Sequence, residues 1–402
     1  MYLPSIAFIF SIVYVLKRIQ MKKQHHKMMA GYTHRIHVNG IRGKSSVTRL
    51  VSAALREGNI KTLGKTTGTA ARLIINHNTD VVIERKEADI AEQKRILDTY
   101  HDKNYAAIVF ECMAINPLYQ RYLEQKIMTS TIGVITNVRE DHMDLLGKTL
   151  PEIARSLCST IPRNGHLVTA ENNPELLEVI REECVKRNSI LHVVEEQAVA
   201  NTDMANFQHF EYKANVAIAL EVAGLCGITR ETALRGMHKA QADPGAFILK
   251  TFTKGYQRMH WANLFAINDR ESFVLTANEL TQKVDRDAKM VVILNNRQDR
   301  PERVSQFVDI AVNSVHADYI VTFGDYEKQV EREVKKLAYT DRRVRVIHMG
   351  NDSSYKNASG EELLNKIVSE IEETEFMILG AVNIHTRQSQ SLLTALGENY
   401  AH

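Results

Sequence analysis

The sequence has little of several features that would assign its class at once. Its 402 residues include four cysteines, none of them in a Cys-x-x-Cys pair, so neither a disulfide framework nor a zinc motif is indicated. Lysine and arginine (51) nearly balance aspartate and glutamate (48), which leaves no bulk positive charge to attract nucleic acid. Apolar residues at 44% and charged residues at 25% exclude a disordered, collagenous or polytopic membrane chain. The length predicts two or three domains, with a cytosolic main body.

The longest apolar run lies at the N-terminus and is short. Residues 1–16 carry no charged side chain, and a basic cluster follows between Lys17 and Lys27. A helix needs roughly 20 apolar residues to span a bilayer, although flanking basic side chains can reach the interface. A signal peptide would place its charges before the apolar run. We expect an uncleaved membrane anchor at 1–20, a basic linker at 21–34 and, by the positive-inside rule, a cytoplasmic body. A buried N-terminal helix or strand is the alternative.

Beyond residue 34, short β-branched runs alternate with helical stretches rich in glutamate, lysine and leucine. YAAIVF at 105–110, IGVIT at 132–136 and MVVIL at 290–294 are typical of buried parallel strands. This alternation predicts an α/β fold with parallel, doubly wound sheets. A segment rich in glycine and proline near residue 245 marks a domain junction. We therefore expect a central domain at 35–245 and a C-terminal Rossmann-like domain at 246–402.

The strongest chemical signal is N-G-I-R-G-K-S-S at 39–46, between a predicted strand and a predicted helix. The full P-loop pattern needs glycine where Val38 stands, so a shortened G-x-x-G-K-S form remains. Backbone N–H groups of such a loop hold phosphate oxygens, and the helix N-terminus adds its dipole. Lys44 is predicted to reach the β- and γ-phosphates, and the Ser45 hydroxyl to bind Mg²⁺. The alternative is a chance glycine-rich turn. The predicted phosphate-binding residues are Asn39, Gly40, Arg42, Gly43, Lys44, Ser45 and Ser46.

Two further polar sites follow predicted strands. Glu111 comes directly after YAAIVF, at the carboxyl end where ligands of α/β sheets bind, and could hold Mg²⁺ or merely cap a loop. T-N-V-R-E-D-H-M-D follows IGVIT, and its His142 could ligate a metal or orient a phosphate. Each signal is weak alone. Together with the glycine-rich loop they predict one site, with Lys44, Glu111 and His142 as its catalytic residues.

In combination, NGIRGKSS, the acidic residue after the second strand and TNVREDHMDLLG resemble the Mur ligase superfamily of ATP-dependent amide ligases. Further segments such as GKTTGTAAR, ECMAINPLYQ and NNRQDRPERVSQF resemble one branch of it, the ligase subunits of bacterial poly-γ-glutamate synthases, which make a capsule polymer. The resemblance runs from about residue 35 to residue 385. It implies ATP and Mg²⁺ as cofactors, with Ser45, Glu111 and His142 around the metal. A carbamylated lysine, present in many Mur ligases, is not identified by any motif here.

The resemblance also implies residues outside the three motifs. Loop and strand residues would hold the substrate carboxylate, and polar residues of both domains would contact the nucleotide. The substrate set is Thr67, Thr69 and Arg72, and the additional nucleotide set is Asn215, Asn268, Asp269, Arg297 and Arg300.

The implied reaction joins glutamate residues through the γ-carboxyl group. ATP would convert a carboxylate to an acyl phosphate, the amine of a glutamate would attack it, and ADP and phosphate would be released. The resemblance further implies membrane subunits of the synthase as partners in a multi-subunit complex, and no nucleic acid. Three alternatives remain open: a related ligase for a folate, a cofactor tail or a wall precursor; a P-loop ATPase or kinase; and an inactive scaffold.

Overall fold

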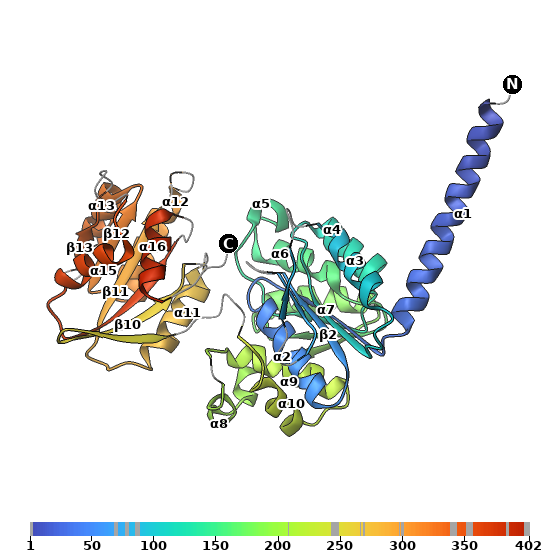
Figure 1. Ribbon diagram of the computed structural model, residues 1–402, viewed down its shortest axis with the longest axis horizontal. Helices are drawn as coiled ribbons and strands as arrows, with labels where there is room; N and C mark the ends of the chain where they lie inside the picture. Colours follow the sequence, from blue (N-terminus) through green and yellow to red (C-terminus); the bar gives the residue numbers. More distant parts are fainter. Residues whose placement is uncertain are drawn as a thin grey trace. The chain divides into compact units, whose positions relative to one another are not determined.

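The computed structural model describes most of the chain, and the chain divides into two compact units, Met1–Ala246 and Phe247–His402 (Figure 1). The described residues are 3–67, 71–76, 80–84, 89–207, 209–242, 249–265, 267, 270–296, 298, 301–337, 344–350, 357–382 and 386–397.

The first unit begins with one continuous helix, α1 (Leu3–Ala30). Residues 21–30 of the basic linker that we expected at 21–34 thus continue this helix, and the linker itself stays a prediction. No glycine or proline interrupts the sequence between Met21 and Ala30, so nothing ends the helix before Gly31. The last turns of α1 belong to the core: Met29 is 2% exposed, and the His25 Nε2 atom lies 2.9 Å from the Ile127 carbonyl oxygen.

Within the part of the chain that the structure describes, no helix combines the length and the apolar character needed to cross a membrane. The expected membrane anchor at 1–20 therefore stays a prediction.

The first unit contains an eight-stranded sheet in the order β4-β3-β2-β5-β1-β6-β7-β8. Strands β2, β5, β1, β6, β7 and β8 are parallel, whereas β3 and β4 run antiparallel to their neighbours. The expected parallel sheet is thus mixed at one edge. The link from Thr66 to Arg72 is too short for a parallel crossover, which needs a dozen or more residues. The strands are β1 (His34–Asn39), β2 (Thr62–Thr66), β3 (Arg72–Ile74), β4 (Asp80–Val82), β5 (Ala107–Glu111), β6 (Ile132–Ile135), β7 (His166–Thr169) and β8 (Ile190–Val193).

Helices cover both faces of this sheet, so its central strands are buried on two sides (Figure 1). Ile36 and Val38 of β1 pack with α2, α9 and α10 on one face, while Phe110 of β5 packs with α3 and the helical turn after α4 on the other. The helices are α2 (Lys44–Glu57), α3 (Ala91–Tyr100), α4 (Pro117–Tyr122), η1 (Leu123–Met128), α5 (Met143–Leu146), α6 (Leu150–Leu157), η2 (Cys158–Thr160), α7 (Pro174–Lys186), η3 (Glu196–Ala198), α8 (Asn201–Met204), α9 (Lys213–Leu225) and α10 (Arg230–Met237).

The second unit contains a six-stranded sheet in the order β13-β12-β11-β14-β10-β9, with β9 antiparallel to β10 and the rest parallel. The β9–β10 hairpin turns at Gly255, whose φ of 61° favours glycine. The hydrophobic core of the second unit includes Trp261, Phe265 and Phe376. The elements are β9 (Lys250–Lys254), β10 (Gln257–Asn263), α11 (Arg270–Thr281), β11 (Lys289–Asn296), α12 (Glu302–Asp309), η4 (Ile310–Ser314), β12 (Tyr319–Gly324), α13 (Glu327–Leu337), β13 (Arg345–His348), α15 (Gly360–Ser369), β14 (Glu375–Ala381) and α16 (Arg387–Ala395).

The four cysteines agree with the sequence interpretation. Cys112, Cys158, Cys184 and Cys226 are all buried and unpaired, so no disulfide joins them.

Candidate functional site

The glycine-rich segment forms a loop between the end of β1 at Asn39 and the start of α2 at Lys44. Two of its positions admit only glycine. Gly40 has φ 124° and Gly43 has φ 81°, and an added Cβ would lie 2.0 Å from the Thr136 Oγ1 atom at the first and 2.5 Å from the Asn215 Oδ1 atom at the second. Because both residues are glycines, the loop backbone can pass close to Thr136 and Asn215 before it enters α2. This is the strand–loop–helix context that phosphate binding requires.

The loop is braced by the segment that follows β6. The Thr136 hydroxyl donates to the Arg42 carbonyl oxygen at 2.6 Å. The Asn137 side chain accepts from the Arg42 backbone N–H at 3.1 Å and donates to the same carbonyl at 3.2 Å. Sequence reasoning assigned this segment to metal or phosphate contacts and missed its bracing role. No strand order was predicted from the sequence, so nothing there indicated that β6 lies beside β1.

Lys44, Ser45 and Glu111 meet at the beginning of α2. The Lys44 ammonium donates to the carbonyl oxygens of Gly40 (2.8 Å) and Ile41 (3.1 Å). Burial lowers the pKa of Lys44 below its ordinary value, and the nearby Glu111 carboxylate opposes that effect. The Ser45 hydroxyl donates to Glu111 Oε2 at 2.8 Å. A cationic side chain, a hydroxyl and a carboxylate thus share one end of the loop.

Glu111 is the last residue of β5, is 3% exposed, and is paired in register with Val38 of β1. Its Oε2 atom accepts a second hydrogen bond, at 2.7 Å, from the backbone N–H of Thr67 just after β2. Its position at the carboxyl end of a parallel strand is the usual place for ligand-binding groups in α/β sheets.

The oxygen pair of Ser45 and Glu111 suits a magnesium ion. Mg²⁺ prefers oxygen ligands and commonly takes one or two from the protein, completing its shell with phosphates and water. Among the described residues, no group of three or more histidine, cysteine, aspartate or glutamate side chains could hold a metal ion. His142 caps α5 in a left-handed conformation (φ 45°), and its side chain is 48% exposed, with Nε2 3.9 Å from Asp141 Oδ1.

The side chains of two predicted phosphate-binding residues bind other parts of the protein. Asn39 is buried, and its side-chain amide donates to Gln120 Oε1 (3.0 Å), the Leu157 carbonyl (3.3 Å) and Thr160 Oγ1 (3.1 Å). With its amide hydrogens directed there, Asn39 has only its backbone to offer a phosphate. Arg42 pairs with Asp141 at 3.4 Å.

Other predicted residues border the same site. Asn215, in the first turn of α9, lies against Gly43 and is 4% exposed. Arg72 begins β3 in register with Thr66, and its buried Nε atom has no hydrogen-bond partner in the described structure. Ser46 lies half-buried in the first turn of α2. The remaining predicted residues fall outside the described residues: Thr69, Asn268, Asp269, Arg297 and Arg300.

Sequence reasoning missed one close neighbour of Glu111. Gln93, in the first turn of α3, is fully buried, and its side-chain amide donates to the Glu111 carbonyl oxygen at 2.8 Å. A single glutamine in an amphipathic helix carries no local signal of such a contact.

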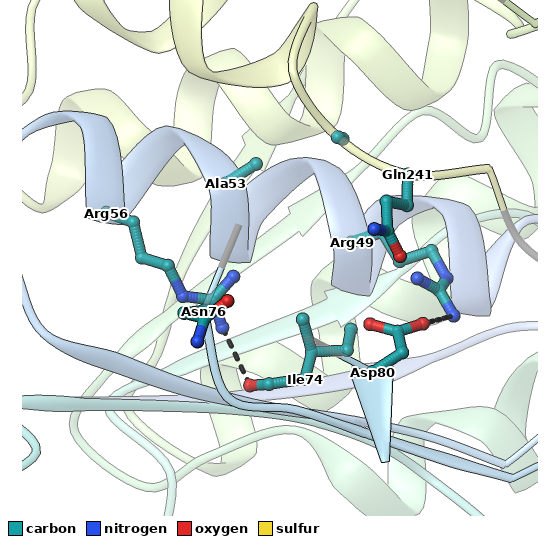
Figure 2. Close-up of a pocket in the computed structure, with 8 residues that line it drawn as sticks. Arg49, Ala53, Arg56, Ile74, Asn76, Asp80 and Gln241 are labelled. Carbon is teal, nitrogen blue, oxygen red and sulfur yellow. Dashed lines mark hydrogen bonds and ion pairs between the residues drawn. The ribbon is translucent and has the colours of Figure 1, made fainter. Parts of the chain in front are cut away.

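A small polar pocket lies further along α2, beside the β3–β4 hairpin (Figure 2). In Figure 2, Arg49 pairs with Asp80 at 2.6 Å, and Arg56 donates to the Ile74 carbonyl at 2.8 Å. Its volume of about 10 Å³ is that of a single water site, and none of the predicted site residues lines it. It is too small for a substrate.

Comparison with known proteins first defines the class. Residues 38–241 match the Mur ligase middle domain. The fold is similar to that of a folylpolyglutamate synthase/dihydrofolate synthase from Yersinia pestis, solved with AMPPNP and a manganese ion (TM-score 0.61, 14% identity, 95% of this chain and 93% of that chain). Fold and middle domain are those of a Mur-type ligase.

The particular family follows from the second unit and from sequence relatives. Residues 248–399 match the C-terminal domain of poly-γ-glutamate synthase CapB. The capsule biosynthesis protein CapB of Bacillus anthracis is 36% identical over 327 residues, 81% of this chain and 69% of the relative. The PGA synthase CapB of Bacillus subtilis (strain 168) is 33% identical over 367 residues, 90% of each chain. The chain therefore belongs to the CapB family of Mur-type ligases.

Proposed function

We propose that the chain is an ATP-dependent carboxylate–amine ligase that joins glutamate residues through the γ-carboxyl group, forming poly-γ-glutamate and releasing ADP and phosphate. The observation that carries the proposal is the contact of Ser45 and Glu111 (2.8 Å) at the head of a glycine-rich loop, within a CapB-family chain. This pair supplies a hydroxyl and a carboxylate where the phosphates of ATP would lie.

The loop and Lys44 would bind the triphosphate. The backbone N–H groups of Gly43, Lys44 and Ser45 lie at the N-terminus of α2, where they suit phosphate oxygens, whereas those of Ile41 and Arg42 donate to Asn137. The Lys44 ammonium, now bonded to two loop carbonyls, would turn to the β- and γ-phosphates and stabilise the charge that develops on the transferred phosphoryl group. A bound Mg²⁺, held by Ser45 and Glu111, would supply further charge neutralisation and orient the γ-phosphate.

The chemistry then runs in two steps. A carboxylate oxygen attacks the γ-phosphorus and ADP leaves, which gives an acyl phosphate. The amine of glutamate attacks the acyl carbon, loses a proton and expels phosphate, which gives the amide. His142, exposed at the start of α5, is the candidate to accept that proton.

The substrate carboxylate would bind at the end of β2 and the start of β3. The backbone N–H of Thr67 donates to Glu111. Arg72 is the first residue of the neighbouring strand β3, and its buried Nε atom has no hydrogen-bond partner in the described structure. Arginine binds carboxylates through paired N–H groups, which suits a γ-glutamyl chain. Thr69, and in the second unit Asn268, Asp269, Arg297 and Arg300, complete the proposed substrate and nucleotide sets.

We also propose that the first half of α1 attaches the enzyme to a membrane, where further synthase subunits would join it. Side chains of Ile12, Val13, Tyr14, Val15 and Leu16 are exposed, and the first charged residue is Lys17. An apolar helix end followed by basic residues is typical of membrane attachment. Sedimentation of the full chain with the membrane fraction, resistant to high salt, is expected. Recovery in the soluble fraction would refute the attachment.

The function is tested with detergent-extracted full chain, ATP and Mg²⁺. We expect ADP and phosphate when glutamate or a short γ-glutamyl oligomer is added, together with a lengthened γ-linked product. AMP and pyrophosphate would contradict the acyl-phosphate route. ADP formed equally without acceptor would indicate a plain ATPase, and a product formed only with a folate acceptor would indicate a folate ligase.

A further inference from the structure

The first turn of α3 holds the main chain of Glu111. Gln93 is fully buried, and its Nε2 atom donates to the Glu111 carbonyl oxygen at 2.8 Å. Its Oε1 atom is buried without a hydrogen-bond partner in the described structure. A buried amide with one unpaired end costs stability. The hydrogen bond to Glu111 is therefore the one contact by which glutamine differs from an apolar side chain at this position.

Glu92, the residue before Gln93, binds β2, the strand beside β5. Glu92 pairs with Lys65 of β2 at 2.8 Å, with side chains 6% and 0% exposed. Two residues after Lys65, the backbone N–H of Thr67 donates to Glu111 Oε2 at 2.7 Å. Two adjacent residues of α3 therefore act on the surroundings of Glu111. Gln93 binds its main chain, and Glu92 binds β2, the strand after which Thr67 donates to the Glu111 carboxylate.

We propose that Gln93 is a positioning residue, which presets the Glu111 carboxylate for the divalent metal of the bound nucleotide, with the Lys65–Glu92 pair fixing β2 beside it. The inference rests on the proposed function, since it assumes that Glu111 holds the metal. Ser45 and Thr67 both donate to one carboxylate oxygen, Oε2, while Gln93 donates to the backbone carbonyl of the same residue, so the three contacts together set the direction of this carboxylate. Groups that orient a metal ligand in this way typically change metal affinity 10- to 100-fold when removed.

The test measures binding of AMPPNP to the full chain by titration calorimetry, once with Mg²⁺ and once with EDTA. The ratio of the two dissociation constants reports the metal contribution without any turnover. Gln93→Met keeps the length of the side chain and removes the donor. We expect it to reduce this ratio about tenfold relative to the wild type, with the affinity in EDTA unchanged. If this variant does not fold, Gln93→Glu, which replaces the donor by an acceptor, makes the same comparison.

Gln257→Met is the matched control. Gln257 is a buried glutamine of the second unit whose amide also donates to backbone carbonyls, those of Ile371 (2.6 Å) and Glu373 (3.1 Å). Its substitution should leave the ratio unchanged.

Glu111→Gln separates the two ways of failing. If Glu111→Gln abolishes the metal contribution while Gln93→Met keeps the wild-type ratio, the positioning role is refuted and the proposed function stands. If Glu111→Gln itself keeps the wild-type ratio, the metal role of Glu111 fails. An equal loss in Gln257→Met would show that the effect is one of general stability, and would also refute the inference.

Discussion

Raising the pH from about 6 to about 10 is expected to destabilise the first unit through one buried ion pair. His37, in β1, is 0% exposed, and its Nδ1 atom lies 2.8 Å from Glu124 Oε2. The other oxygen of Glu124 accepts hydrogen bonds from the backbone N–H (2.9 Å) and the hydroxyl (2.8 Å) of Ser130. The carboxylate is therefore fixed where it faces the imidazole.

The pKa of His37 sets the size of the effect. Burial lowers this pKa, but side-chain hydrogen bonds with Cys112 and Glu124 outweigh burial and raise it from 6.5 to about 9. The folded state therefore binds the proton more tightly than the unfolded state. The resulting stability is fully present below pH 6.5 and is lost as the pH rises through about 9. At about 1.4 kcal/mol per pH unit, the difference amounts to about 3 kcal/mol.

Urea unfolding at the two pH values, followed by far-ultraviolet circular dichroism, measures this effect. Glu124→Gln removes the carboxylate but keeps the hydrogen bond between His37 and Cys112, so its stability should depend less on pH than that of the wild type, and the difference between the two proteins isolates the contribution of the pair. Trp261, the one tryptophan, lies in the second unit, so its fluorescence is an internal control that should not change between the variants. Equal pH dependence in wild type and Glu124→Gln would refute the reasoning.

Three further outcomes are expected around the nucleotide loop. Lys44→Ala should abolish ADP formation while its circular dichroism spectrum and melting temperature stay those of the wild type; an active Lys44→Ala protein would overturn the P-loop assignment. Gly43→Ala should weaken AMPPNP binding at least tenfold in calorimetry, because φ is 81° and the new Cβ would meet Asn215 Oδ1 at 2.5 Å; unchanged affinity would contradict the need for glycine. Lys65→Met should lower the free energy of unfolding by about 3–5 kcal/mol, because it removes the cationic partner of the buried Glu92 carboxylate. Adding Glu92→Met should restore most of that stability in urea denaturation, and failure to do so would show that the pair itself is stabilising.

The sequence predicted those parts of the structure that local patterns determine. Strands of β-branched residues and the turn between Val38 and Lys44 are encoded within short windows, so the alternating fold and the loop were predictable. Tertiary contacts decided the rest. Antiparallel β3 depends on a short link rather than on its own composition, and Gln93 meets Glu111 across 18 positions of sequence. Neither carries a periodic signal.

The way α1 ends decides where the protein can be shortened. Residues 11–24 are exposed, whereas His25, Met29 and Tyr32 are buried in the first unit. A protease that trims the exposed stretch should therefore release an intact catalytic body. A cut after Ala30 would instead remove Met29 from the core and the His25 contact with Ile127. A shortened version of this protein should begin no later than residue 24, so that the buried end of α1, with His25 and Met29, stays packed in the first unit.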